Sequence, residues 1–234
     1  MPSIRILTLE SDDDAETVRC LAKKLAAFMQ LAPIQIYTAG GPQPQLRKVI
    51  QNYLKQDDYV IIVIDSDGRM TQHERSQQPN SLKNQSRRIV NDRQFSGKVF
   101  LVEAIQELEA WLLIDCIGIF CYYATKRAQF RENCRDKVSA DVSLKRFVSN
   151  NQKGDTEKIV EAVSGGKGAK EHLIELSEKV LRQLNPNLTQ RDIDRKKYHE
   201  SRAPEVAEHI EINAETLRRN DSLKKLGDVI AQFQ

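Results

Sequence analysis

The sequence predicts an α/β fold: a mainly parallel sheet of four strands with flanking helices, followed by a helical C-terminal extension. Two observations predict it. Tyr59–Ile64 is an uninterrupted apolar run rich in β-branched residues, typical of a central strand buried on both faces. Segments with strand and helix periodicity also alternate along the first half of the chain. This order favours parallel strands joined by right-handed helical crossovers.

The first two strand–helix units precede the central strand. Ser3–Leu9 alternates well enough for a strand, and apolar residues spaced three and four apart predict a helix over Ala15–Leu31. Acidic residues at its start suit the helix dipole, and Pro33 ends it. Ile34–Tyr37 is a short second strand. Pro44–Gln56 is a second helix with its apolar residues on one side.

The remaining units of the sheet follow the central strand. Residues 68–81 are polar and typical of a loop, and Leu82–Arg93 is a basic helix. Lys98–Val102 is the fourth strand, and Ala104–Ala124 is predicted as one long apolar helix. The sequence therefore predicts an α/β domain over residues 1–125.

The second half of the chain differs in composition. Residues 126–202 hold 18 Lys/Arg against 12 Asp/Glu, and Gly and Asn-Pro breaks separate short helical segments. We expect residues 126–234 to form a basic helical subdomain and tail packed against the first domain. The helices expected here are Val142–Val148, Thr156–Val163, Ala169–Leu184, Pro204–Ile210 and Ala214–Phe233.

Composition excludes several classes of protein. The 234 residues carry a net charge of only +3, and no apolar run is long enough to cross a bilayer. The N-terminus shows no signal-peptide pattern, so we expect a cytoplasmic protein with no membrane contact. The four cysteines form no Cys-x-x-Cys and are expected to be reduced thiols. The four histidines offer no ligand spacing, and a zinc site is not expected.

Acidic residues follow three of the predicted strands. Glu10 follows the first, Asp65 and Asp67 follow the third, and Glu103 follows the fourth. The carboxyl ends of parallel strands meet at one edge of a sheet, so these side chains are expected to converge. Clustered carboxylates repel one another unless a cation neutralises them, and hard divalent cations favour oxygen ligands. The pattern predicts a site for Mg²⁺ or Mn²⁺, although Asp-Ser-Asp-Gly is also ordinary turn chemistry.

The combination of Glu10 with Asp65-Ser66-Asp67 resembles the TOPRIM domain of topoisomerases, bacterial primases and nucleases of the overcoming-lysogenisation-defect type. Asp14 falls where that family often has a second acid. Ser11 replaces the usual glycine, and Arg69 replaces the third aspartate of the topoisomerase motif, which favours the nuclease branch.

The segment Glu107–Asp115 is similar to the E-x-E-x-W-L-L-x-D pattern of small stand-alone TOPRIM-like proteins, and residues 203–210 and 220–226 are similar to the end of that family. The resemblance implies a nuclease that acts on DNA or RNA in bacterial anti-phage defence. It also implies a partner, an ABC/SMC-type ATPase. The sequence does not determine the oligomeric state, and a homodimer is one alternative.

The resemblance and the residues together imply roles for individual side chains. Glu10, Asp65 and Asp67 are expected to hold two metal ions and to carry catalysis, with Glu10 as a candidate proton relay. Further candidate ligands are Asp14, which also suits an acidic first turn, and Glu103 and Glu107; Glu109 ranks lower. Lys167 is the preferred cation for the scissile phosphate, with Lys170 beside it. Trp111 is expected to be a core residue.

Two alternatives belong to other classes of protein. A receiver-like signalling module also has acids after its first strand and an aspartate after its third, although no strand ending in lysine is evident after Glu103. A TOPRIM-like scaffold that binds its ATPase without catalysis is the other.

Overall fold

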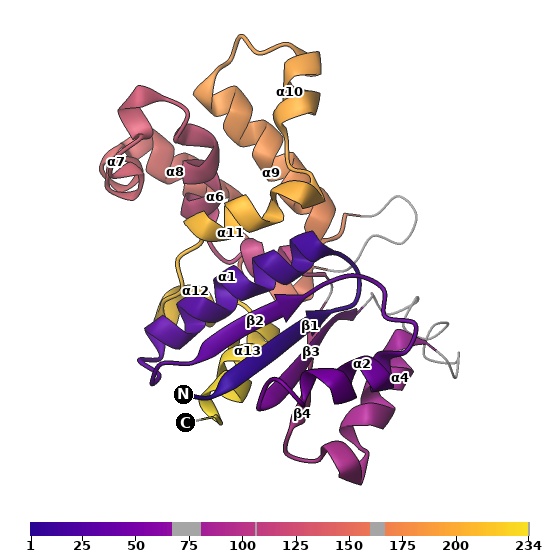
Figure 1. Cartoon of the computed structure of the whole chain (residues 1–234). Coiled ribbons are helices and arrows are strands. Elements are labelled where there is room, and N and C mark those ends of the chain that lie inside the picture. Colours follow the sequence, from indigo (N-terminus) through magenta and orange to yellow (C-terminus); the bar gives the residue numbers. More distant parts are fainter. Residues whose placement is uncertain (67–80, 106, 160–166, 234) are drawn as a thin grey trace.

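A computed structural model describes residues 1–66, 81–105, 107–159 and 167–233, and confirms the predicted α/β class. Four parallel strands form one sheet in the order β2-β1-β3-β4 (Figure 1). Their bounds are Ser3–Thr8 for β1, Gln35–Ala39 for β2, Tyr59–Ser66 for β3 and Val99–Ile105 for β4. β3 lies inside the sheet between β1 and β4, as its continuous apolar run predicted.

Helices cover both faces of the sheet. α2 (Leu46–Tyr53) and α4 (Leu82–Val90) pack on one face against Leu7, Ile62 and other apolar side chains. α1 (Asp12–Phe28) and α13 (Asp221–Ala231) cover the other face, over the alternate residues of the same strands. Because side chains alternate along a strand, β3 contributes Ile62 and Ile64 to one core and Ile61 and Val63 to the other.

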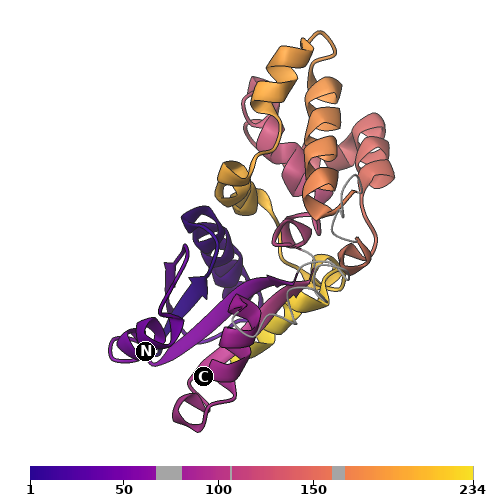
Figure 2. The same cartoon turned by 90° about the vertical axis from the view of Figure 1, so that its right-hand side faces the viewer.

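The rest of the chain is helical, and Figures 1 and 2 both place α6–α10 beyond one end of the sheet. The helices are α5 (Glu109–Leu112), α6 (Cys116–Ala124), α7 (Cys134–Ala140), α8 (Val142–Asn151), α9 (Ala169–Leu184), α10 (Gln190–Lys196), α11 (Ala203–His209) and α12 (Ala214–Leu217). Short 3₁₀ turns are η1 (Arg93–Phe95), η2 (Ala128–Phe130), η3 (Thr156–Lys158) and η4 (Glu200–Arg202). Among the helices described, none is both long and apolar enough to span a membrane.

The C-terminal helices return to the sheet layer. α11 lies along α1 in Figure 1, and the Lys24 ammonium of α1 donates to three backbone carbonyls, those of Ala207, Glu208 and Ile210, at 2.7–2.9 Å. These carbonyls lie at the C-terminal end of α11, where cations are stabilised by the helix dipole. α13 packs against β4, and Phe233 stacks on Tyr59 with ring centroids 4.0 Å apart.

The predicted helix over Ala104–Ala124 is wrong in its first part. β4 continues to Ile105, and the helical segment that follows is divided into α5 and α6. Asp115 causes the division, because its Oδ1 accepts from Gly118 N at 3.0 Å and caps α6. The predicted helix over Ala214–Phe233 is divided in the same way, since Asn220 caps α13 by accepting from Leu223 N at 2.9 Å.

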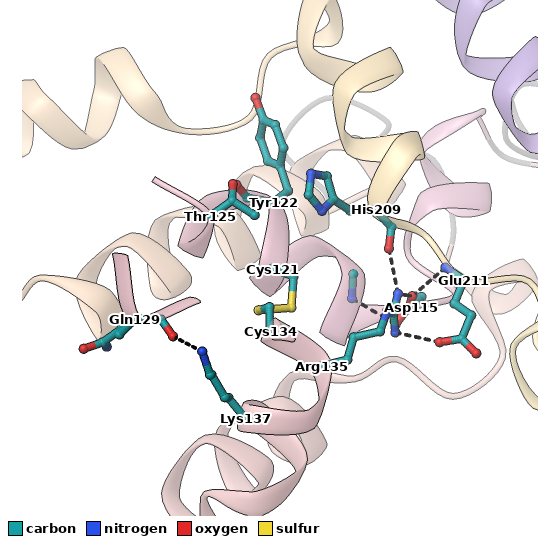
Figure 3. Close-up of a disulfide and its surroundings, with 11 residues drawn as sticks. Asp115, Cys121, Tyr122, Thr125, Gln129, Cys134, Arg135, Lys137, His209 and Glu211 are labelled. Carbon is teal, nitrogen blue, oxygen red and sulfur yellow. Dashed lines mark hydrogen bonds and ion pairs between the residues drawn. A yellow bond between two sulfur atoms is a disulfide. The ribbon is translucent and has the colours of Figure 1, made fainter. Parts of the chain in front are cut away.

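The expectation that all cysteines are reduced is also wrong. A disulfide joins Cys121 of α6 to Cys134 of α7, while Cys20 and Cys116 are free (Figure 3). Close to it, Arg135 binds both the Asp115 carboxylate and the His209 carbonyl. A bond between positions 13 residues apart cannot be inferred from cysteine spacing alone, since the pairing depends on how α6 and α7 pack.

Candidate metal centre at the carboxyl end of the sheet

Asp65 lies at the carboxyl end of β3, where it pairs with Ala104 of β4. Its position in the alternation places its side chain on the face of Ile61 and Val63, under α1 and α13. Solvent reaches part of the residue, but its Oδ1 is buried and has no hydrogen-bond partner within the described residues. Buried polar atoms are almost always paired, so an orphaned carboxylate oxygen indicates a missing ligand or a functional site.

Other acidic side chains surround Asp65. Burial raises the pKa of Asp65 well above its ordinary range, and repulsion from Glu10, Glu109, Asp14 and Glu107 raises it further. These four residues come from the β1–α1 connection, the first turn of α1 and the segment after β4. We call Glu10, Asp14, Asp65, Glu107 and Glu109 the acidic cluster. The structure thus brings most of the predicted site residues within electrostatic reach of one carboxylate.

Asp14 belongs to both the cluster and the start of α1. Ser11 is the N-cap of α1, and its hydroxyl accepts from Asp14 N at 3.1 Å and donates to Asp14 Oδ2 at 2.7 Å. Burial raises the pKa of Asp14, and repulsion from Glu200 adds to this, while the Ser11 hydroxyl opposes it. Capping therefore fixes the position of the side chain and leaves its Oδ1 for another partner.

Glu107 and Glu109 follow β4 and face the start of α9. Glu107 has a φ of 104°, a conformation that favours glycine and costs about 1–3 kcal/mol in other residues. Its Oε2 accepts from the backbone N of Lys170 at 2.9 Å. Glu109 is buried and accepts from the Tyr198 hydroxyl at 3.2 Å; burial raises its pKa to about 6. Contacts from the helical half of the chain therefore hold both glutamates.

Lys170, rather than Lys167, is the lysine placed beside the acidic cluster. Its ammonium forms an ion pair with Glu200, which raises its pKa, and Glu109 and Glu107 raise it further. Lys167 instead pairs with Glu175 at 2.7 Å. Lys167 and Lys179 together lower the pKa of Glu175 to about 2. Lys167 is thus engaged along the flank of α9.

Glu103 does not join the acidic cluster. The predicted end of its strand is wrong: Glu103 lies inside β4, opposite Ile64, so its side chain is on the α2/α4 face. There it pairs with Lys83 at 2.9 Å and with Arg87 at 2.7 Å. Partial burial opposes its ionisation, but these two cations outweigh burial and lower the pKa of Glu103. Two positive partners already neutralise this carboxylate.

The acidic cluster is a candidate site for a divalent cation. Asp67 lies outside the described residues, and among those described no three Asp, Glu, His or Cys side chains are placed so as to hold a metal ion. The donor chemistry nevertheless suits Mg²⁺ or Mn²⁺, because the acidic cluster offers carboxylate oxygens and includes the orphaned Asp65 Oδ1.

Trp111 has a structural role in the hydrophobic core. Its predicted place in the core is confirmed: it is fully buried, and its indole N–H donates to Ser222 Oγ at 2.8 Å. That hydroxyl donates in turn to Asn220 Oδ1 at 2.8 Å, and Asn220 Nδ2 donates to Thr156 Oγ1 at 2.8 Å. A buried polar chain therefore joins α5, α13 and η3. This chain gives the residues around 220–222 a structural role.

Tyr198 and Glu200 are functional candidates that sequence reasoning missed. They are about 90 residues from Glu109 in the chain and belong to no motif that marks them. Only the packing of α9 and η4 against α5 and its neighbours brings them to the acidic cluster. No family model, curated protein or solved structure matches this chain.

Proposed function

We propose that this protein is a metal-dependent phosphodiester hydrolase, a TOPRIM-type nuclease that acts on DNA or RNA with Mg²⁺ or Mn²⁺. The observation that carries the proposal is the buried Oδ1 of Asp65, which lacks a partner among the described residues and lies among the acids of the cluster. An uncompensated group of this kind is costly in a folded protein, and a divalent cation would offset both the desolvation and the repulsion. Asp65 also lies at the carboxyl end of a parallel sheet, and open α/β folds bind their ligands at that end.

The position of each residue determines the role that we propose for it. Asp65 and Asp67 would hold the metal from the end of β3, and Glu10, Asp14 and Glu107 would complete its ligands. When bound, the metal would supply positive charge to the attacking and leaving oxygens of the phosphodiester. Lys170 would bind a non-bridging oxygen of the phosphate, with Glu200 orienting its ammonium until substrate arrives.

The test is a cleavage assay with labelled single- and double-stranded DNA and RNA. Wild-type protein should cut at least one of them with Mn²⁺ or Mg²⁺ and not with EDTA. Asp65→Asn should reduce cutting to the level without enzyme. Asp228→Asn is the matched control, because Asp228 is exposed on α13 away from the acidic cluster. Equal cutting by wild type and Asp65→Asn would refute the proposed site.

The proposal also includes the setting implied by the resemblance: a cytoplasmic defence protein that works with an ABC/SMC-type ATPase. The assay should therefore be repeated with any ABC/SMC-type ATPase that is found encoded beside this protein. The Cys121–Cys134 disulfide is of a kind more common in oxidising compartments. A free-thiol count on protein recovered from cytosol would test whether that bond forms at the proposed location.

A further inference from the structure

A cavity lies in the helical half of the molecule, with a volume of about 240 Å³. Its walls are the C-terminal end of α6, the C-terminal half of α9 and the segment from Lys196 to Arg202. Its lining residues differ entirely from those of the acidic cluster. Its character differs as well, because the charged side chains that line it are cations.

Four cations border this cavity, and no carboxylate of the described residues does: Lys126, Arg127, Lys196 and Arg202. In the described part of the chain none of them forms an ion pair. Arg202 contacts the Tyr122 hydroxyl at 3.5 Å and the Arg195 carbonyl at 3.2 Å, both uncharged. By contrast, Lys167, Lys170 and Lys197 are each paired with a glutamate or an aspartate. The Tyr122 hydroxyl that Arg202 contacts donates to Glu205 at 2.6 Å, and Glu205 itself does not line the cavity. The charged side chains of the lining are thus all positive, which favours an anionic ligand.

The rest of the cavity lining is mostly apolar. Leu181, Leu184 and Leu188 line it from α9 and the segment after it, and Tyr122 and Tyr123 line it from α6. The two tyrosine rings meet edge to face with centroids 4.8 Å apart. An inorganic anion would contact none of this apolar surface. The wall therefore indicates a ligand that joins an anionic group to a flat apolar one.

Tyr123 contributes its ring to the cavity. Only 8% of the residue is exposed, and its hydroxyl is buried without a hydrogen bond of good geometry among the described residues. The nearby Ser177 Oγ donates to Ile174 O at 2.6 Å and accepts from Tyr198 N at 2.8 Å, which leaves it one further acceptor position. Burial raises the pKa of Tyr123, and the Ser177 hydroxyl opposes that shift. The ring of Tyr123 is therefore the part that a ligand would contact, and its hydroxyl belongs to the protein interior.

We propose that this cavity binds one nucleotide, with the phosphate on Lys126, Arg127, Lys196 and Arg202 and the base against the leucine and tyrosine wall. The volume is slightly below that of sites for drug-sized ligands, about 300–1,000 Å³, which suits one nucleotide and not two. Asn185 provides a polar group for the edge of the base. The site goes beyond the proposed hydrolase and does not depend on it.

The cavity and the acidic cluster share one segment of chain. Lys196 and Arg202 border the cavity, while Tyr198 and Glu200, between them, bind Glu109 and Lys170. A nucleotide that shifts this segment would therefore also move the partners of the acidic cluster.

The test is equilibrium binding of fluorescently labelled AMP, GMP, CMP and UMP to the full chain, measured by polarisation. Unlabelled mononucleotides, a short single-stranded oligonucleotide and inorganic phosphate serve as competitors. Arg127→Gln/Lys196→Gln should bind about a hundredfold more weakly, because removing each charge-assisted hydrogen bond weakens binding about tenfold. Tyr123→Phe keeps the ring that lines the cavity and removes only a buried hydroxyl, so it should bind as wild type does.

Two controls keep the result specific. Lys224→Gln/Lys225→Gln removes the same charge from exposed positions of α13 and should bind as wild type does. Asp65→Asn should also bind normally, so that failure of the hydrolase proposal and failure of this one remain distinguishable. Competition by oligonucleotide but not by mononucleotides would overturn the mononucleotide site and assign the cavity to a nucleic acid. Equal competition by phosphate and mononucleotides, no binding at millimolar nucleotide, or unchanged binding by Arg127→Gln/Lys196→Gln would also overturn the proposal.

Discussion

Replacing Asp65 by asparagine should stabilise the metal-free protein. The substitution keeps the shape of the side chain and removes an ionisable group whose Oδ1 is buried without a described partner, beside Glu10, Asp14, Glu107 and Glu109. An unsatisfied buried polar group costs about 1–3 kcal/mol, and more if charged, and the new amide can donate to a neighbouring carboxylate. For a chain of 234 residues this corresponds to a rise of roughly 3–9 °C in Tm.

Bound metal should make the wild type more stable than Asp65→Asn. Saturating Mn²⁺, at about a hundred times its dissociation constant, should stabilise the wild type by about 2.7 kcal/mol through its binding to the native state. The variant lacks the central ligand and should gain little. Thermal denaturation followed by circular dichroism, with EDTA and with Mn²⁺, measures both effects, and Asp228→Asn should behave as wild type does. A lower Tm for Asp65→Asn in EDTA would show that the carboxylate is already compensated, and the reasoning would fail.

Three further predictions concern the rest of the fold. Ser222→Ala leaves the Trp111 indole N–H unpaired in the core, so the free energy of unfolding in urea should fall by about 1–3 kcal/mol, while Ser222→Thr should lose less. Replacing both Cys121 and Cys134 by serine should lower the free energy of unfolding of the oxidised protein by about 2–4 kcal/mol, and equal stability of the two proteins would contradict the disulfide. Burial and Lys24 lower the pKa of His209, so the folded state favours the neutral imidazole. The stability that depends on this neutral form is present above about pH 6.5 and is lost as pH falls through the native pKa. The loss of stability between about pH 7 and 5 should be smaller in His209→Gln, and an unchanged pH profile would exclude this origin.

The sheet could be predicted because its signals are local. A continuous apolar run such as Tyr59–Ile64 is buried on both faces by its own composition, and alternation of strands and helices leaves few topologies. Element ends were harder, because they depend on single capping contacts. Asp115 divides an apolar stretch that periodicity alone predicts as one helix, and its partner Arg135 is 20 residues away. Because the predicted strand ended too early, Glu103 was also expected to follow the strand and join the other acids, whereas it lies inside β4 on the opposite face from Asp65.

Topology alone predicted the acidic cluster only for residues at the ends of strands, and Asp14, Glu107 and Glu109 were predicted from the resemblance. Glu10 and Asp65 are marked by the topology, since parallel strands end at one edge. Lys170 and Glu200 are not, because nothing in the sequence places α9 or η4 against that edge. A choice between Lys167 and Lys170 needed the direction of α9, whose first turn faces Glu107 and whose flank carries Glu175, the partner of Lys167.

The helical half of the chain therefore belongs to the acidic cluster itself. Glu107 is held in a backbone conformation unfavourable to it, and a contact that compensates is the hydrogen bond from Lys170 N at the start of α9. Glu109 depends in the same way on Tyr198. Without residues 126–234, both glutamates would lose these partners, and the segment after β4 would be free to leave the strained conformation. Such strain persists only where surrounding structure over-determines it, so the geometry of the cluster is set by the packing of α9 against α5 as much as by the sheet.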